Sequence, residues 1–333
     1  MSVDAKPEMP IFETSEGFVQ PFYLTGEHDG NQTPLVRGRF ARLTSPCQSI
    51  LGRHDYPACI NELCAEAMSL AACLSTTLKF EGVFTLQARG DGIVRTLFAD
   101  VTSAGAMRSY AAFDAEKAKA IAPAGPAILP RLMGGGYMAF TVDQDAAHGD
   151  EARRYQGIVE LEGSHLGDCA VSWFKNSEQL AAQVITAATK TEDGWHSAAL
   201  FLQQVAGEGG HDTRLSEDEL ADQWHTAMVM MSSVTRDELL SPSLEVPDLL
   251  FRLFHAQNVH LQAPRPITDT CRCSAEKVEQ VLGGLAAEAL RDISDEDGQL
   301  HVCCEFCKIT RSYSMAEFLS AKSCRPFKKI TQR

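Results

Sequence analysis

Residues 270–274 read TCRCS and residues 304–307 read CEFC, and these two short stretches decide how the C-terminal part of the chain folds. Two close pairs of cysteines supply four thiolates, which is the ligand set of a tetrahedral structural zinc site. The C-x-x-C half is a common zinc knuckle. The C-x-C half is rarer because a single intervening residue gives a tighter bite, and this makes the combination specific. The spacing predicts one zinc site with four ligands: Cys271, Cys273, Cys304 and Cys307.

The residues around the two pairs predict a small folded module. Ser274 can cap a helix, and residues 295–298 (DEDG) predict a turn. Residues 300–303 and 308–311 would be the two strands of a hairpin around the second pair. Residues 314–317 form a capping box that starts a last helix. The helix after Ser274 carries apolar residues at helical spacing, namely Val278, Val281, Leu282, Leu285 and Ala289.

Cys303 and Cys324 are left over from the two pairs. Cys303 adjoins Cys304, but its spacing to Cys307 would be C-x-x-x-C, so Cys304 is the preferred ligand. Cys303 could still compete for the metal or for a disulfide. His301 is a further possible ligand, although four thiolates already fill a tetrahedral site.

Four zinc-bound thiolates allow two kinds of module. A purely structural ion would only hold the module together. A redox switch would use the same thiolates as nucleophiles toward peroxide or hypochlorite, because zinc keeps them deprotonated. Neighbouring thiols would then condense, which pairs Cys271 with Cys273 and Cys304 with Cys307. Structural zinc contributes about 10–16 kcal/mol in small peptides, and this is also folding energy, so losing it should unfold the module.

Size and charge restrict the remaining possibilities. The 333 residues exceed one average domain, and an apolar fraction of 44% is enough for a sizeable core. The net charge of −14 disfavours non-specific binding to nucleic acid. Residues 1–7 (MSVDAKP) do not resemble a signal peptide, and no run of about 18 apolar residues predicts a membrane span. We therefore expect a cytoplasmic protein without a membrane partner, whose eleven cysteines are thiols or metal ligands.

The first 205 residues predict an α+β domain. Residues 1–16 are expected to be a loose terminus, and residues 57–78 a long helix whose cysteines belong to the core. Helices and strands mix without strict βαβ alternation. The glycines at 134–136 lack dinucleotide-binding spacing, no P-loop or G-x-S-x-G occurs, and we expect no enzyme. Strands are expected near residue 18 and over 35–40, 82–88, 93–98, 137–142, 157–161, 183–189 and 197–205, with a second helix over 164–174.

Residues 206–268 predict a helical connector. The composition shift at 207–212 (GEGGHD) marks a domain exit. Capping boxes at 216–219 and 235–238 start two helices, and Pro247 opens a third. Their apolar stripe either packs simply on the first domain or belongs to a metastable segment that docks in one state and detaches in another; both can hold together. The predicted organisation is a core domain over 1–205, the connector over 206–268 and a zinc-binding domain over 269–333.

Several upstream motifs, independent of the cysteines, resemble those of one family. With the two cysteine pairs they make the chain resemble the heat-shock protein 33 family, the redox-activated bacterial holdase chaperones, over nearly its whole length. The upstream motifs are Arg37-Gly38-Arg39, His54-x-Tyr56-Pro57, Leu78-Lys79-Phe80-Glu81-Gly82, Leu86-Gln87, Arg108-Ser109-Tyr110, residues 157–163 (GIVELEG) and Ser177-Glu178-Gln179.

The resemblance implies a reduced, zinc-bound, inactive monomer. Oxidation would form the disulfides Cys271–Cys273 and Cys304–Cys307, release zinc and unfold the connector. The chain would then dimerise and hold unfolding client proteins without ATP, and ATP-dependent chaperones would refold the clients later. The candidate client-binding side chains are the apolar ones of the connector, together with the strand surface that it covers: Leu220, Trp224, Met228, Met231, Leu250 and Phe254.

The chain departs from the family pattern at a few positions. Ala181 and Ala182 stand where a proline usually follows the Ser-Glu-Gln motif. Lys308 follows the last ligand, where the family often has a small residue or Asn, and it could lower the pKa of Cys307. The chain also has a longer N-terminus and a basic tail over residues 322–333.

The residues disfavour three functions other than a chaperone. A zinc enzyme needs an open coordination position and a general base, whereas four thiolates close the site. A nucleic-acid-binding zinc ribbon needs a basic face, which only the tail offers. A thiol oxidoreductase using Cys304 and Cys307 would want strand–C-x-x-C–helix context, whereas this pair is expected between strands.

Overall fold

The computed structural model describes residues 17–28, 31–78, 80–119, 128–144, 153–205 and 216–323. The chain divides into two compact units, residues 1–270 and residues 271–333. The predicted loose terminus, the predicted domain exit at 207–212, and Cys324 lie outside the described residues.

One sheet of the first unit, called sheet A, is covered on both faces. Its strands are hydrogen-bonded in the order β10-β1-β2-β9-β8, with β11 also on β1, and every pair is antiparallel. Residues 197–202 of β9 are all buried, as expected when neither face meets water. The strands are β1 (Gly17–His28), β2 (Asn31–Leu43), β8 (Ala182–Thr191), β9 (Gly194–Gln204), β10 (Val259–Leu261) and β11 (Arg265–Pro266).

The second sheet, called sheet B, has the order β12-β5-β4-β3-β6-β7. Its pairs are antiparallel except for β12, which runs parallel to β5. Alternate residues of β3, namely Phe84, Leu86 and Ala88, are buried, as the period of a half-covered strand requires. The strands are β3 (Gly82–Gly90), β4 (Val94–Thr102), β5 (Ala106–Phe113), β6 (Gly136–Gln144), β7 (Arg154–Glu160) and β12 (Thr268–Asp269).

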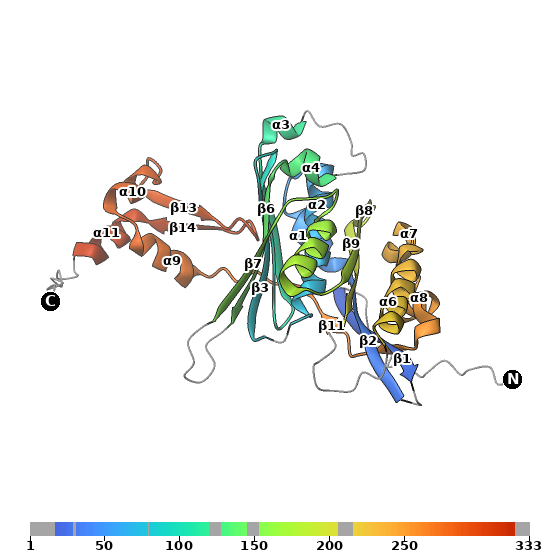
Figure 1. The fold of residues 1–333 in the computed structure, drawn as a ribbon. Helices are drawn as coiled ribbons and strands as arrows, with labels where there is room; N and C mark the ends of the chain where they lie inside the picture. Colours follow the sequence, from blue (N-terminus) through green and yellow to red (C-terminus); the bar gives the residue numbers. More distant parts are fainter. Residues whose placement is uncertain are drawn as a thin grey trace, which may run out of the picture. The chain divides into compact units, whose positions relative to one another are not determined.

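Helix α2 (Ala58–Ser75) lies between the two sheets (Figure 1) and packs on β9 and β4. It is the one helix in the described part that is long and apolar enough to cross a membrane, but 83% of that window is buried inside the fold. Its core position therefore accounts for its apolar length. Cys64 and Cys73 are fully buried, as predicted, and Cys59 is half-buried. The other helices of this part are α1 (Ser45–Gly52), α3 (Ala115–Lys119), α4 (Ile128–Met133), α5 (Leu166–Trp173) and the π-helix η1 (Phe174–Glu178).

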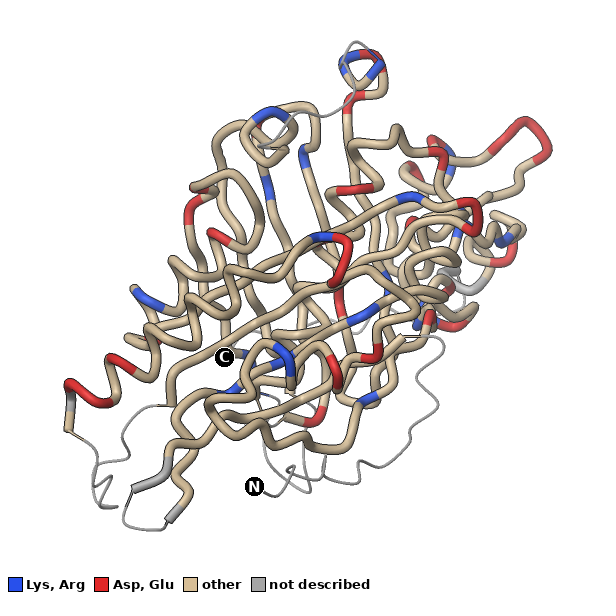
Figure 2. Tube along the Cα trace, turned by 90° about the vertical axis from the view of Figure 1, so that its right-hand side faces the viewer, with Lys and Arg blue, Asp and Glu red and all other residues tan. Residues whose placement is uncertain are grey.

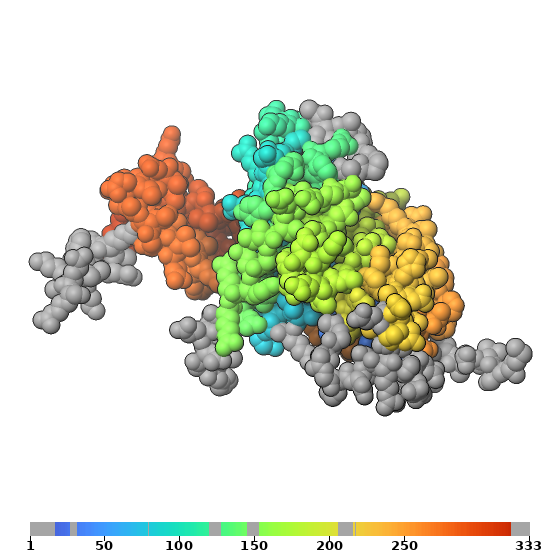
Figure 3. Space-filling view, viewed as in Figure 1, coloured from blue at the N-terminus to red at the C-terminus, as the bar shows by residue number. Residues whose placement is uncertain are grey.

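The connector helices cover the other face of sheet A, and Figure 3 shows them in yellow to orange as a layer on the first unit. They are α6 (Glu217–Ser232), α7 (Arg236–Leu240), α8 (Val246–Phe254) and the short 3₁₀ turn η2 (His255–Gln257). Both predicted capping boxes are confirmed: Ser216 accepts from the backbone of Glu219, and Thr235 from that of Glu238. A proline in the first turn opens α8, also as predicted.

The second unit is small. Its hairpin of β13 (Gln299–Cys303) and β14 (Thr310–Ser314) is confirmed, and so is the last helix, α11 (Met315–Ser323). The single helix predicted after Ser274 is wrong. It is two helices, α9 (Ala275–Gly284) and α10 (Ala287–Asp292), because two glycines end the first one. Val281, predicted on its apolar stripe, is 65% exposed.

Candidate metal centre

The four cysteines come from two segments that approach each other in the second unit. Cys271 and Cys273 lie in extended chain just before Ser274, whose side chain caps α9 by accepting from Lys277 N. Cys304 and Cys307 lie in the tight turn between β13 and β14. Two backbone bonds close this turn, from Lys308 N to Cys304 O at 2.9 Å and from Cys304 N to Ile309 O at 3.0 Å.

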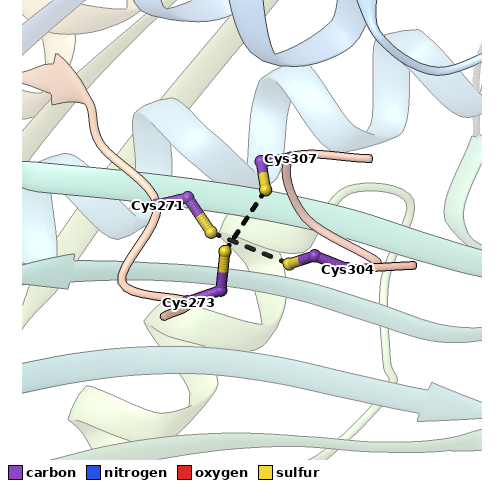
Figure 4. Close-up of side chains that lie close together, drawn as sticks. All are labelled: Cys271, Cys273, Cys304 and Cys307. Carbon is purple, nitrogen blue, oxygen red and sulfur yellow. Dashed lines mark hydrogen bonds between the residues drawn. The ribbon is translucent and has the colours of Figure 1, made fainter. Parts of the chain in front are cut away.

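The four Sγ atoms all lie within 4.8 Å of one another (Figure 4). Cys271 Sγ is 3.8 Å from Cys304 Sγ, and Cys273 Sγ is 3.4 Å from Cys307 Sγ. Four sulfurs bound tetrahedrally at about 2.3 Å from one ion would be roughly 3.8 Å apart. These separations are close to those of a tetrahedral site, so the four residues fit a four-thiolate metal centre.

The surroundings shift the pKa values of Cys271, Cys273 and Cys307 in different directions. Burial acts to raise the pKa of Cys273, but hydrogen bonds from Cys307, Cys271 and Arg311 outweigh it and lower the pKa to about 7. The guanidinium of Arg311 lies 3.5 Å from Cys273 Sγ. Burial raises the pKa of Cys307 to about 12 and also raises that of Cys271. A positive charge from the protein thus supports the Cys273 thiolate, whereas Cys271 and Cys307 need a cation to ionise at neutral pH.

The competing ligands lie outside the cluster. Cys303 is exposed, and His301 is hydrogen-bonded to Asp295 and Ser312 on the hairpin. Lys308 pairs with Glu305 at 2.8 Å. The expectation that Lys308 lowers the pKa of Cys307 is therefore wrong, because burial of that thiol dominates.

Two of the alternative functions find no support in this geometry. The Cys304–Cys307 pair joins two strands and does not open a helix, unlike the context expected of a thiol oxidoreductase. Figure 2 shows basic residues scattered among acidic ones along the described trace, which gives no support to a nucleic-acid-binding face. The basic tail beyond residue 323 is not described.

A family model described as Hsp33 protein matches residues 31–314. The chain belongs to the Hsp33 family. A 33 kDa chaperonin of Caulobacter vibrioides is 35% identical over 279 residues, which cover 82% of this chain and 88% of that protein. A 33 kDa chaperonin of Nitrosococcus oceani is 33% identical over 273 residues, covering 82% of this chain and 85% of that protein.

The fold is that of Hsp33 as well. The crystal structure of a 33 kDa chaperonin, a heat shock protein 33 homologue from Thermotoga maritima, aligns with a TM-score of 0.70 at 20% identity. The alignment covers 91% of this chain and 99% of that structure. The predicted α+β architecture with a C-terminal four-cysteine module is therefore confirmed.

The candidate client-binding residues of this Hsp33-family chain lie at one interface, with a single exception. Met231, Leu250 and Phe254 are fully buried in the cluster between the connector and sheet A, and Leu220 and Trp224 pack against it half-buried. Met228 is half-buried but is not part of that cluster. The apolar side chains of the connector pack on sheet A, as expected if they simply complete the core of the first unit. Detachment of the connector stays a prediction.

Two arginines that the sequence did not single out fasten the connector. Arg42 of β2 donates to the carbonyls of Leu244 at 2.9 Å and Leu239 at 3.3 Å. Burial lowers the pKa of Arg42 to about 10. Arg236 of α7 pairs with Glu62 of α2 at 3.0 Å and also donates to the carbonyl of Ala188. No local signal could have revealed these contacts, since the partners are far apart in the chain.

Proposed function

We propose that this Hsp33-family chain is a redox-activated, ATP-independent holdase chaperone of the cytoplasm. When it is reduced, the four cysteines would hold zinc and the connector would cover sheet A. When it is oxidised, the covered surface would bind unfolding proteins. The approach of four sulfurs within 4.8 Å carries this proposal, because such a switch needs thiols that are metal ligands and oxidisable neighbours at once.

Zinc is the ion that suits this donor set, since four thiolates in a tetrahedron are typical of structural zinc. When bound, it would keep all four sulfurs ionised and therefore nucleophilic. Arg311 would add a second positive charge near Cys273, because its Nη1 atom lies 3.5 Å from Cys273 Sγ. The ligands would be Cys271, Cys273, Cys304 and Cys307.

Oxidation would convert each pair of thiols to a disulfide. Peroxide oxidises one thiolate to a sulfenic acid and releases hydroxide. The neighbouring thiolate then displaces a second hydroxide, so that two thiols and one peroxide give one disulfide and two waters. The closest sulfurs in the folded module belong to different segments. Once the module unfolds, short loop closure favours sequence neighbours, which gives Cys271–Cys273 and Cys304–Cys307.

The module would unfold when its thiolates are oxidised, because little else holds it. Its described core contains three fully buried side chains, Leu282, Leu290 and Leu300, with partly buried neighbours. Structural zinc contributes about 10–16 kcal/mol in small peptides. That is comparable to the ~5–15 kcal/mol stability of a whole domain.

Release of the connector would uncover a continuous apolar surface on sheet A. Large aromatic and aliphatic side chains of this kind bind unfolded segments without sequence selectivity. The oxidised chain would also dimerise through exposed surface and pass its clients to ATP-dependent refolding chaperones. The strand residues that the connector buries include Phe18, Phe22, Leu24, Phe40, Leu200 and Leu202.

Light scattering from a thermally unfolding client protein tests this function. The chain is added either reduced and zinc-loaded or after treatment with peroxide at elevated temperature, and a third sample is oxidised and then reduced again with zinc. We expect suppression of aggregation only by the oxidised sample, with the effect reversed in the third. Equal behaviour in both redox states with zinc retained would mean that the metal is merely structural.

A further inference from the structure

Residues 259–270 cross from sheet A to sheet B as one extended segment, here called the strap. Strands β10 and β11 lie along β1 in sheet A, and β12 lies along β5 in sheet B. Backbone hydrogen bonds continue between these strands, so the strap is bound to both sheets. Three of them, each 2.9 Å long, run from Gln262 N to Pro21 O, from Ile267 N to Gly17 O and from Thr268 N to Gly105 O.

The crossing point of the strap is packed closely. Ile267 is 3% exposed and belongs to the core between the sheets. Gly105 has φ of +87°, and a Cβ there would lie 2.1 Å from Pro266 O. Only glycine allows the β4–β5 turn to approach the strap so closely. The strap is therefore part of the folded first unit and is not a loose tether.

Asp269, the last residue of β12, is held by polar contacts here called the clamp. Arg53, the residue that caps the C-terminus of α1, donates Nη1 to Asp269 Oδ2 and Nη2 to Oδ1, both at 2.7 Å. The hydroxyl of Ser49 donates to Oδ2 as well. The Asp269 side chain is 16% exposed, and a bidentate guanidinium–carboxylate pair is stronger and more directional than a single contact.

We propose that this clamp sets how far unfolding of the zinc module spreads into the connector. The proposal rests on the proposed redox function. Asp269 stands two residues before Cys271, so about 7 Å of extended chain separates the clamp from the first thiol. One residue further on, Thr270 N donates to Met107 O of β5 at 3.1 Å, still within the first unit.

The clamp acts as a stop because local unfolding proceeds from a free end. An unfolded module frees the chain up to Cys271, and the next contacts to break are those of Thr270 and Asp269. While the clamp holds, β12, β11 and β10 stay paired, and α8, which ends at Phe254 just before them, stays on sheet A. When it opens, the strap can peel from both sheets and expose the end of α8 to fraying.

Hydrogen exchange of α8 peptides, followed by mass spectrometry, tests this proposal in the full chain. The variants Asp269→Ala and Arg53→Gln and their combination are compared with wild type over a series of peroxide doses, and zinc release is measured in parallel. We expect the same zinc-release curve for all four proteins and roughly tenfold faster α8 exchange in the oxidised variants, as expected for the loss of a charge-assisted contact. The double variant should be no faster than either single variant.

Arg95→Gln is the matched control, since Arg95 pairs with Asp114 at 3.8 Å on the exposed surface of the same unit. It should behave as wild type. Equal α8 exchange in oxidised wild type and Asp269→Ala would overturn the clamp. So would rapid α8 exchange in the reduced, zinc-loaded variant, because the module would then have no part in holding the connector. Failure of the redox function would be seen in a different measurement, the light-scattering assay. In that case the oxidised wild type would not suppress client aggregation.

Discussion

Cys303 is the thiol that could form a disulfide with the wrong partner when this chain is oxidised. It is exposed, lies outside the sulfur cluster and adjoins Cys304. In an unfolded module it would compete with Cys304 for Cys307. We predict that Cys303→Ser keeps one zinc per chain and gives a more uniform Cys304–Cys307 disulfide, as measured by metal release and disulfide mapping. Cys304→Ser, the matched ligand variant, should lose zinc; loss of zinc from Cys303→Ser instead would contradict this assignment.

The single side chain of Arg42 makes two hydrogen bonds that hold the connector on sheet A. Its guanidinium donates to two connector carbonyls and lies 5.3 Å from the centre of the Phe40 ring. Arg42→Ala should cost about 1.5–3 kcal/mol, because hydrogen bonds from a charged group are lost. We expect faster hydrogen exchange in α7 and α8 and some holdase activity without oxidant. Arg154→Ala, which removes an exposed arginine, should show neither effect.

Glu66 of α2 is a buried carboxyl, 3% exposed. Burial raises its pKa above the ordinary value of 4.5, although His165 acts in the opposite direction. The folded state therefore holds this proton more tightly than the unfolded chain, and stability falls as pH rises through the window above 4.5 and stays lower beyond it.

Glu66→Gln should accordingly raise the thermal midpoint at neutral pH, by about 2–4 °C for each kcal/mol gained. The difference from wild type should shrink as the pH falls toward 4.5, where the native carboxyl is itself neutral. Thermal scans at several pH values measure this, with the exposed Glu116→Gln as control. A pH-independent difference would mean that packing, and not charge, distinguishes the two side chains.

At the scale of elements, α6 offers a matched test of docking. Trp224 packs half-buried against the cluster on sheet A, and Met228 is half-buried outside that cluster, whereas Val229 and Met230 are 47% and 37% exposed. We predict that Trp224→Ser with Met228→Ser weakens docking and gives partial holdase activity without oxidant. Val229→Ser with Met230→Ser changes the same helix on its outer side and should not. Equal light-scattering results for the two double variants would show that docking of α6 does not control holdase activity.

The elements that the sequence predicted well are those with local signals. The caps at Ser216 and Thr235 mark helix starts, because a side chain and a backbone group three residues apart satisfy each other. The short strands β10, β11 and β12 were missed, since their existence depends on pairing with β1 and β5, far away in the chain. Strand β5, with α1, α3 and α4, also went unassigned.

The four zinc-ligand candidates were predictable for the same reason, because each pair is a local motif. What joins the two pairs is a distant contact, but four thiolates in one small unit have few other ways to be satisfied. No local sequence motif predicts the contacts that Arg42 and Arg236 make with the connector and α2. The same holds for the clamp at Asp269. Their partners are backbone carbonyls and single carboxylates that look ordinary in the sequence, so only the folded arrangement reveals them.

For the whole molecule, the two helical layers on sheet A differ in how deeply they are enclosed by the rest of the first unit. Helix α2 lies between two sheets and is buried along most of its length, so it cannot leave without dismantling the core. The connector covers the opposite face of sheet A from outside and leads directly to the strap and the cysteines. We therefore expect that the connector, unlike α2, could leave sheet A while the rest of the first unit stays folded.

The two units should therefore respond separately to metal removal. In the described part of the second unit the hydrophobic core has three buried side chains, whereas the first unit has extensive clusters on both faces of sheet A. A zinc chelator added under reducing conditions should unfold α9, α10 and α11 while the strands of sheets A and B stay protected, as followed by hydrogen exchange. If the clamp at Asp269 holds, α8 should remain protected too, so the thiols can be metal-free without a full release of the connector. Simultaneous loss of protection in α8 and α9 would show that the metal alone holds the connector.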